Sequence, residues 1–238
     1  MTEKLFSDVE YNYKLIEQRI SEAAEKTGRK RDDITFLAAT KTVDVEVINY
    51  AISLGLKYIG ENRVQELLSK YERYDLDNAS LQFIGHLQTN KVRQIVDKVD
   101  LIQSVDSVKL AKEISKQSEK HGITSDILIE VNIGDEDSKS GIDASSVYEL
   151  IDEIKDFPNI SVKGLMCIPP ICDSPQKNSK FFDKMNNIFI DISAKNIDNI
   201  SMDILSMGMS ADYYEAILSG ANMVRVGSSL FGARDYQR

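Results

Sequence analysis

Apolar residues recur at every third or fourth position near the amino terminus. They run from Leu5 to Ala24 along one face of segment 3–26. This spacing predicts an amphipathic helix, because residues three and four apart share a helix face. Gly28 follows and is expected to end the helix.

The pattern then changes to short apolar runs, polar turns and longer amphipathic segments, which is typical of successive β-α units. The predicted strands are 34–40, 57–60, 81–85, 101–105, 126–132, 162–166, 202–207 and 222–227. The predicted helical segments after them are 44–54, 62–72, 88–98, 107–120, 143–155, 175–194, 211–219 and 228–232.

Eight such units favour a single (β/α)8 TIM barrel over residues 1–238, with an additional helix at the amino terminus. An open, doubly wound sheet is the alternative. No G-x-G-x-x-G motif follows the first predicted strand, so the commonest sequence support for that alternative is missing.

Composition and charge narrow the classes of function. The 238 residues are 42% hydrophobic and carry a net charge of −9, which repels polyanions and argues against nucleic-acid binding. The apolar runs are short and no signal peptide is evident, so we expect a cytoplasmic protein that does not bind membranes. Cys167 and Cys172 lack the further ligands of a zinc site, and no metal is expected. We expect both thiols to be reduced, with a disulfide between them as the alternative.

Candidate binding residues lie where the predicted strands end. In a TIM barrel the loops after the seventh and eighth strands frequently bind phosphate. Here those loops contain Ser206, Gly208 and Ser210, then Gly227 and Ser228. Backbone N–H groups and hydroxyls before a helix can converge on a dianion. The two glycines could instead serve only to permit tight turns, but two such loops at these strands favour a phosphate site.

Lys41 follows the first predicted strand, at the barrel mouth. Partial desolvation there favours the neutral amine, which can form a Schiff base. A lysine after a strand is more often a solvated loop residue, but phosphate loops across the barrel would supply the other half of an aldehyde-phosphate site. His86 is a candidate acid or base, or simply a hydrogen-bonding turn residue. The acidic run 135–137 is expected to be a solvated turn.

Six stretches also carry a family resemblance. They are FLAATKTVDVEVINYAISLGLKYIGENRVQELLSK, FIGHLQTNKVRQIV, SVDS, EVNIGDEDSKSG, GLMCIPP and SMGMSADYYEAILSGANMVRVGSSLFGAR. In order and spacing, from about Ile34 to Tyr236, the chain closely resembles the pyridoxal phosphate homeostasis protein family. The resemblance implies a barrel like the N-terminal domain of alanine racemases and eukaryotic ornithine decarboxylases, with pyridoxal 5'-phosphate (PLP) held as a Schiff base on Lys41.

The resemblance also implies roles for other residues. Its phosphate contacts fall on Ser210, Gly227 and Ser228, with Ser206 and Gly208 beside them, its pocket residues on Asn62 and Met166, and its pyridine-nitrogen partner on Arg225. A guanidinium donates a hydrogen bond to that nitrogen without protonating it, so the ring would remain a poor electron sink.

Related racemases need a second acid or base from a C-terminal domain, which a sequence ending at Arg238 is not expected to supply. The implied function is therefore carriage and buffering of PLP in vitamin B6 and amino-acid homeostasis, without established turnover. We expect a monomer that delivers PLP to apo PLP-dependent enzymes. One alternative is a weak amino-acid racemase using Lys41 with His86 or water, and another is a regulatory scaffold.

Two further hypotheses stay open at this point. Lys139 is a second lysine that could hold the cofactor transiently. Cys167 or Cys172 could form a reversible hemithioacetal with its aldehyde.

Overall fold

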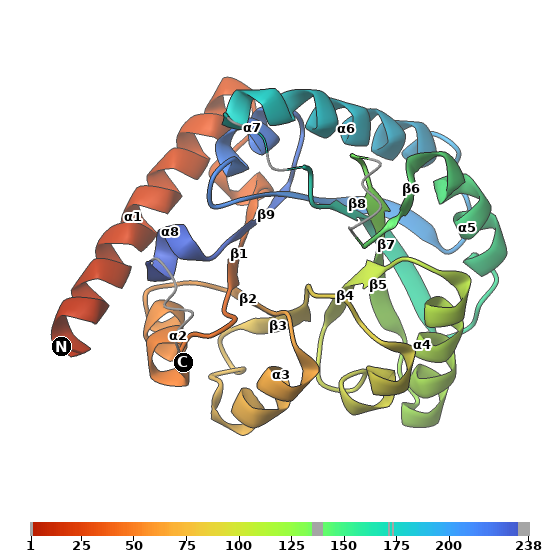
Figure 1. The fold of residues 1–238 in the computed structure, drawn as a ribbon, viewed down its shortest axis with the longest axis horizontal. Helices are drawn as coiled ribbons and strands as arrows, with labels where there is room; N and C mark the ends of the chain where they lie inside the picture. Colours follow the sequence, from red (N-terminus) through yellow and green to blue (C-terminus); the bar gives the residue numbers. More distant parts are fainter. Residues whose placement is uncertain (1, 135–139, 171, 173, 233–238) are drawn as a thin grey trace.

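A computed structural model describes residues 2–134, 140–170, 172 and 174–232 of the chain (Figure 1). Eight parallel strands form a closed barrel, because β1 pairs with β9 and β4 pairs with β5. The strands are β1 (Thr35–Ala39), β2 (Tyr58–Glu61), β3 (Ser80–Phe83), β4 (Leu101–Val105), β5 (Ser125–Asn132), β7 (Ile160–Cys167), β8 (Ile200–Met209) and β9 (Met223–Val226). The predicted barrel is confirmed, and the open sheet is wrong.

Helices surround the barrel as the sequence predicts (Figure 1). They are α1 (Thr2–Lys26), α2 (Val45–Ser53), α3 (Val64–Lys70), α4 (Val108–His121), α5 (Val147–Ile154), α6 (Ser179–Ser193), α7 (Tyr213–Leu218) and α8 (Ser228–Phe231). The additional helix α1 packs against α2, α7 and α8. None of the helices in the described part of the chain is long and apolar enough to span a bilayer.

Two predicted segments differ from the structure. Segment 88–98 contains a 3-10 helix, Thr89–Gln94, in place of an α-helix. Its apolar residues Val92 and Ile95 are buried as the spacing suggests. The Ile95 N–H donates to the Val92 carbonyl three residues earlier, which is the hydrogen bond of a 3-10 helix. A short strand β6 (Ile142–Asp143), which no pattern predicted, also pairs with β5 and overlaps the first residue of the predicted helical segment 143–155.

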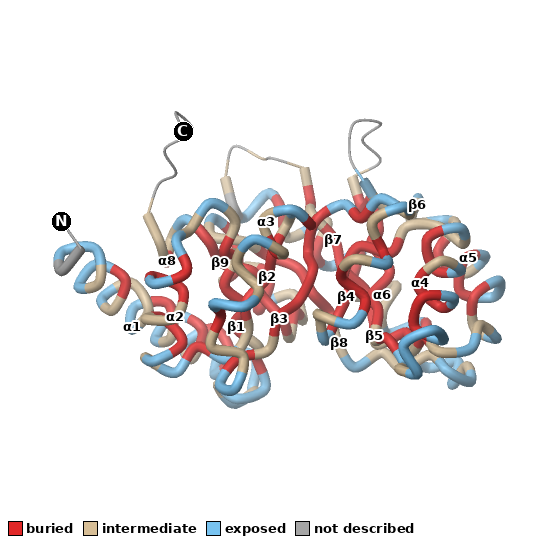
Figure 2. Tube along the Cα trace, turned by 90° about the horizontal axis from the view of Figure 1, so that it is seen from below, coloured by how far each residue is buried: buried red, intermediate tan, exposed pale blue. Residues whose placement is uncertain are grey.

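Apolar side chains form two separate cores. A large core lies between the strands and the surrounding helices. Buried residues accordingly run through the centre of the molecule (Figure 2). A smaller core fills the barrel itself and consists of Leu37, Ile84, Leu101, Leu128, Met166 and Met223. The barrel is therefore packed below its mouth, as alternation of side chains along each strand requires.

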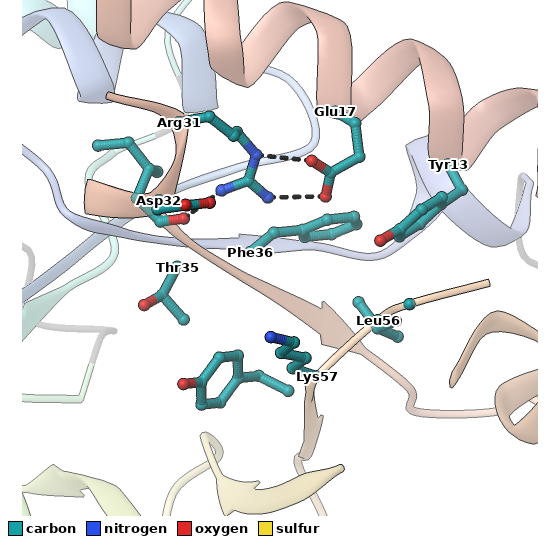
Figure 3. Close-up of a pocket in the computed structure, with 11 residues that line it drawn as sticks. Tyr13, Glu17, Arg31, Asp32, Thr35, Phe36, Leu56 and Lys57 are labelled. Carbon is teal, nitrogen blue, oxygen red and sulfur yellow. Dashed lines mark hydrogen bonds and ion pairs between the residues drawn. The ribbon is translucent and has the colours of Figure 1, made fainter. Parts of the chain in front are cut away.

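The amino end of the barrel holds a cavity of about 310 Å³ beneath α1 (Figure 3). Arg31 Nε and Nη2 donate to Glu17 Oε2 and Oε1 at 2.6 and 2.7 Å. Arg31 Nη1 also donates to the Ile34 carbonyl at 2.5 Å. These contacts link α1 to the start of β1, at the end of the barrel opposite the predicted binding residues.

Arg29 also ties distant segments together. Although Arg29 follows the end of α1, it donates to the carbonyls of Ile217 and Ala221 at 2.5 and 2.8 Å. It therefore caps the end of α7.

Candidate functional site

Lys41 follows β1 and lies beside a strained residue. Thr40 is fully buried, Lys41 is half-buried, and Thr42 has a φ of 65°. A β-branched residue is uncommon in this left-handed region, and such strain is concentrated at functional sites. The lysine therefore sits at the carboxyl end of β1, on a turn with an imposed conformation.

The loops after β8 and β9 meet at Ser210. Its hydroxyl oxygen accepts the backbone N–H of Gly227 at 3.0 Å and that of Ser229 at 3.2 Å. The Ser229 hydroxyl donates in return to the Ser210 carbonyl at 3.2 Å. Two backbone donors thus converge on one oxygen position at the barrel mouth, which is a donor set suited to a phosphate.

These loops adjoin Lys41 more closely than the sequence suggested. We expected them across the barrel from the lysine, but β9 pairs directly with β1, with Val226 opposite Ala38. Closure of the barrel makes the first and last strands neighbours. The loop that begins at Gly227 therefore starts next to the strand that leads to Lys41.

Gly208 has a packing role of its own. Its φ is 88°, and a Cβ at this position would lie 2.5 Å from the Ala216 Cβ. Glycine is needed here because β8 and α7 approach closely, in line with the alternative reading of a permissive turn. Gly227 has a φ of −119°, which does not require glycine.

Buried polar atoms without partners cluster at the carboxyl ends of β2, β4 and β5. Among the described residues, Asn62 Oδ1, Ser104 Oγ and Glu130 Oε2 accept and donate no hydrogen bond within the protein. Buried polar groups are normally paired, so such atoms call for a ligand or ordered water. Asn62 was predicted as a pocket residue, whereas Glu130 was not.

Arg225 lies inside the barrel and organises a polar network above the inner core. Its Nη1 donates to Ser206 Oγ at 2.6 Å and its Nη2 to the Cys167 carbonyl at 2.9 Å. Ser206 donates on to Gln103 Oε1 at 2.7 Å, and Gln103 donates to Gln82 Oε1 at 2.6 Å. The network joins β9, β8, β7, β4 and β3, and the hydroxyl of Ser206 is committed to Arg225 and Gln103.

Met166 lies below this network, in the inner core with Leu128 and Met223. Its side chain is fully buried. It can contribute an apolar floor to the site and no polar contact.

Glu130 is a buried acidic residue that interacts electrostatically with Arg225, and the sequence analysis did not single it out. It is 4% exposed, and its pKa is raised to about 7, first by burial and then by Asp106, while Arg225 opposes the shift. Burial likewise lowers the pKa of the Arg225 guanidinium. A single acidic residue within the apolar strand ILIEVN was the available signal, since alternate residues of a barrel strand face inward.

This raised pKa predicts a pH-dependent stability difference for Glu130→Gln. Below pH 4.5 the carboxyl is protonated in both the folded and unfolded states, so it adds no penalty. Between pH 4.5 and 7 the unfolded chain releases the proton while the folded protein retains it, which destabilises the fold by up to about 3 kcal/mol above pH 7. We therefore expect the variant to gain about 2 to 3 kcal/mol relative to the wild type between pH 5 and 8.

Urea unfolding across that pH range measures this difference. Glu119→Gln, which changes an exposed glutamate of α4, is the matched control and is expected to show no such trend. A stability difference between Glu130→Gln and wild type that does not vary with pH would contradict the assignment.

The predicted secondary candidates have different fates. His86 is exposed at the barrel rim, with its Nδ1 3.9 Å from Asp106 Oδ2. Both cysteines are free, so the disulfide alternative is wrong. The Cys167 thiol packs into the outer core and burial raises its pKa to about 12, which makes it a poor nucleophile. Lys139 and the acidic run 135–137 lie outside the described residues.

Metal binding has no support in the described ranges, where no three His, Cys, Asp or Glu side chains are grouped closely enough to hold an ion.

Comparison with known proteins identifies the family of this chain. A model of the alanine racemase N-terminal domain matches residues 11–235. A pyridoxal phosphate homeostasis protein of Aquifex aeolicus (strain VF5) is 44% identical over 220 residues, which cover 92% of this chain and 95% of the relative. The chain belongs to the pyridoxal phosphate homeostasis protein family.

Two solved structures have the same fold as this chain. An unknown protein from Bifidobacterium adolescentis matches with a TM-score of 0.91 and 32% identity, covering 95% of this chain and 96% of that one. PipY of Synechococcus elongatus PCC7942, solved with PLP bound, matches with a TM-score of 0.79 and 27% identity, covering 90% of this chain and all of PipY.

Proposed function

We propose that this chain binds PLP covalently through Lys41 and carries or buffers it in vitamin B6 and amino-acid homeostasis. The main support is the pair of backbone donors from Gly227 and Ser229 that converge at Ser210, beside the strand that leads to Lys41. A phosphate acceptor site and an amine are the two features that an aldehyde-phosphate ligand requires. The names of the relatives and the PLP bound to PipY add to this support.

Each predicted residue has a role in this proposal. Lys41 Nζ forms a bond to the aldehyde carbon, and the carbonyl oxygen leaves as water. Phosphate binding is assigned to Ser210, Gly227 and Ser228, with Ser206 and Gly208 beside them on β8. Contact with the pyridine nitrogen is assigned to Arg225, and the remaining pocket to Asn62 and Met166. The partnerless Asn62 Oδ1 is consistent with a ligand contact at β2.

Arg225 supports carriage of the cofactor over transamination. PLP supplies a reactive aldehyde and an electron-withdrawing ring when it is bound. A guanidinium donates a hydrogen bond without giving up its proton, so Arg225 holds the ring nitrogen in its unprotonated form. That form accepts electron density poorly, which disfavours reactions that need a fully delocalised carbanion, such as transamination, and leaves racemisation possible. Arg225 itself is held in place by Ser206 and the Cys167 carbonyl.

The proposal extends to partners and setting. We propose that the protein acts as a cytoplasmic monomer and that its recipients are apo forms of PLP-dependent enzymes. PLP-loaded protein mixed with an apo-aminotransferase is expected to restore aminotransferase activity as the visible absorbance of the loaded protein declines. Release no faster than from PLP-loaded serum albumin would contradict specific carriage and leave passive storage.

The comparisons do not favour the alternative of a weak racemase, and a separate experiment tests it. The loaded protein is incubated in heavy water with L- and D-amino acids, and the α-proton signal is followed by NMR. We expect no exchange. Exchange that disappears in both Lys41→Ala and His86→Ala would establish racemase chemistry and overturn the non-catalytic proposal.

A further inference from the structure

Thr42 has an unusual backbone conformation for its residue type. Among the described residues, four non-glycine residues have positive φ, and the other three are asparagines, which tolerate this region. Thr42 is β-branched, so its left-handed conformation must be imposed by neighbouring groups. It directly follows Lys41, and its hydroxyl donates to the Lys41 carbonyl at 2.6 Å.

Glu66 holds this conformation from α3. Its Oε1 accepts the Thr42 backbone N–H at 2.5 Å. The same oxygen accepts from Lys70 Nζ at 2.6 Å. The side chains of Glu66 and Lys70 are only 17% and 12% exposed, so solvent screens their attraction weakly.

The residue before Lys41 is held by the same cluster. Lys70 Nζ donates to the Thr40 carbonyl at 3.1 Å and to Glu61 Oε1 at 2.9 Å. Thr40 donates its hydroxyl to Glu61 Oε1 at 2.8 Å, and the Tyr74 hydroxyl donates there at 2.7 Å. Glu61 is fully buried on β2. The backbone on both sides of Lys41 is thus attached to one group of charged side chains, of which Glu61 is fully buried and Glu66 and Lys70 are largely shielded from solvent.

We propose that Glu66, through the Thr42 amide and Lys70, is a positioning residue that holds Lys41 in the orientation required for covalent attachment of PLP. This inference rests on the proposed function. Glu66 contacts the backbone beside the lysine and does not belong to the phosphate loops. Its loss should therefore weaken covalent attachment and leave non-covalent recognition of the phosphate and ring unchanged.

Two ligands separate these effects. PLP can form the covalent bond, whereas pyridoxine 5'-phosphate has an alcohol in place of the aldehyde and binds only non-covalently. We expect Glu66→Ala to weaken PLP binding about tenfold, because this factor corresponds to the free energy stored in one strained backbone conformation. The affinity for pyridoxine 5'-phosphate should stay within about twofold of wild type. Glu66→Gln, whose carbonyl can still accept the Thr42 N–H, is expected to recover most of the loss.

Thr42→Gly provides a second, independent test. Glycine adopts positive φ without strain, so the turn no longer depends on Glu66. The effect of Glu66→Ala on PLP binding is expected to fall below about threefold in the Thr42→Gly background. Glu46→Ala is the control, because it removes an exposed glutamate of the neighbouring α2 that pairs with Arg73. It should change the affinity for neither PLP nor pyridoxine 5'-phosphate.

The outcomes are distinguishable. If borohydride reduction of PLP-loaded wild-type protein gave no stable adduct at Lys41, the proposed function itself would be refuted. A normal wild type combined with equal losses for both ligands, or with the same loss in the Thr42→Gly background, would assign Glu66 a merely structural role and overturn the inference. If Glu66→Ala does not fold, Glu66→Gln replaces it, with a smaller loss expected for PLP alone.

Discussion

Lys41→Ala is expected to abolish covalent attachment of PLP. Borohydride reduces a Schiff base to a stable secondary amine, so wild-type protein should gain the mass of the reduced cofactor on Lys41, and the variant should gain none. The phosphate loops joined by Ser210 remain intact in the variant, so weak binding should persist. We expect an affinity for PLP about 100-fold lower than in wild type, equivalent to about 3 kcal/mol.

Lys57→Ala is the matched control for this experiment. Lys57 is an exposed lysine at the amino end of β2, beside the basal cavity shown in Figure 3, and its replacement should leave both adduct and affinity unchanged. A reduced adduct that persists on another lysine of Lys41→Ala, at wild-type yield, would show that the site was assigned to the wrong residue.

Arg225→Met is expected to destabilise the fold strongly. Methionine fills a similar volume but leaves Ser206 Oγ and the Cys167 carbonyl without their donor. It also removes the positive charge that opposes the raised pKa of Glu130. Removing one member of a buried charged network costs about 3 kcal/mol, measured here as the free energy of unfolding in urea at pH 8.

The partner of Arg225 makes this prediction specific. If the uncompensated Glu130 carboxylate is part of the cost, Glu130→Gln should stabilise the Arg225→Met variant by about 1 kcal/mol or more beyond the gain that it gives in the wild-type background. Arg93→Met, at an exposed position in the 3-10 helix after β3, should be close to neutral. Strict additivity of the Arg225 and Glu130 changes would show that the two side chains are not coupled.

The sequence predicted the barrel because its local patterns are strong. Every predicted strand is present within a few residues, and Lys41 and Gly227 follow strand ends as expected, whereas Gly208 lies within β8. Segment 88–98 failed for an identifiable reason. Its few apolar residues, among them Val92 and Ile95, are compatible with either kind of helix, and periodicity alone does not distinguish i→i+3 from i→i+4 hydrogen bonds.

The site was predicted only in part. Lys41, Ser210 and Gly227 were proposed from their residue types and positions and Asn62 from the family resemblance, whereas Glu130 was overlooked. Its significance depends on Arg225 and Asp106, which lie far away along the chain and approach it only in the closed barrel. The contact between Glu66 and Thr42 was equally hidden, because backbone strain is invisible in residue order.

The sequence by itself determined the number and order of the β-α units, the residues at the strand ends and the family resemblance, since side-chain periodicity and local turn chemistry encode these features. Tertiary structure alone decided which strand ends became neighbours, which carboxylates lost solvent and which backbone turns were held under strain. Ser206 and Gln103, 103 residues apart, illustrate the reason: a hydrogen bond and a shifted pKa depend on distance and burial in three dimensions.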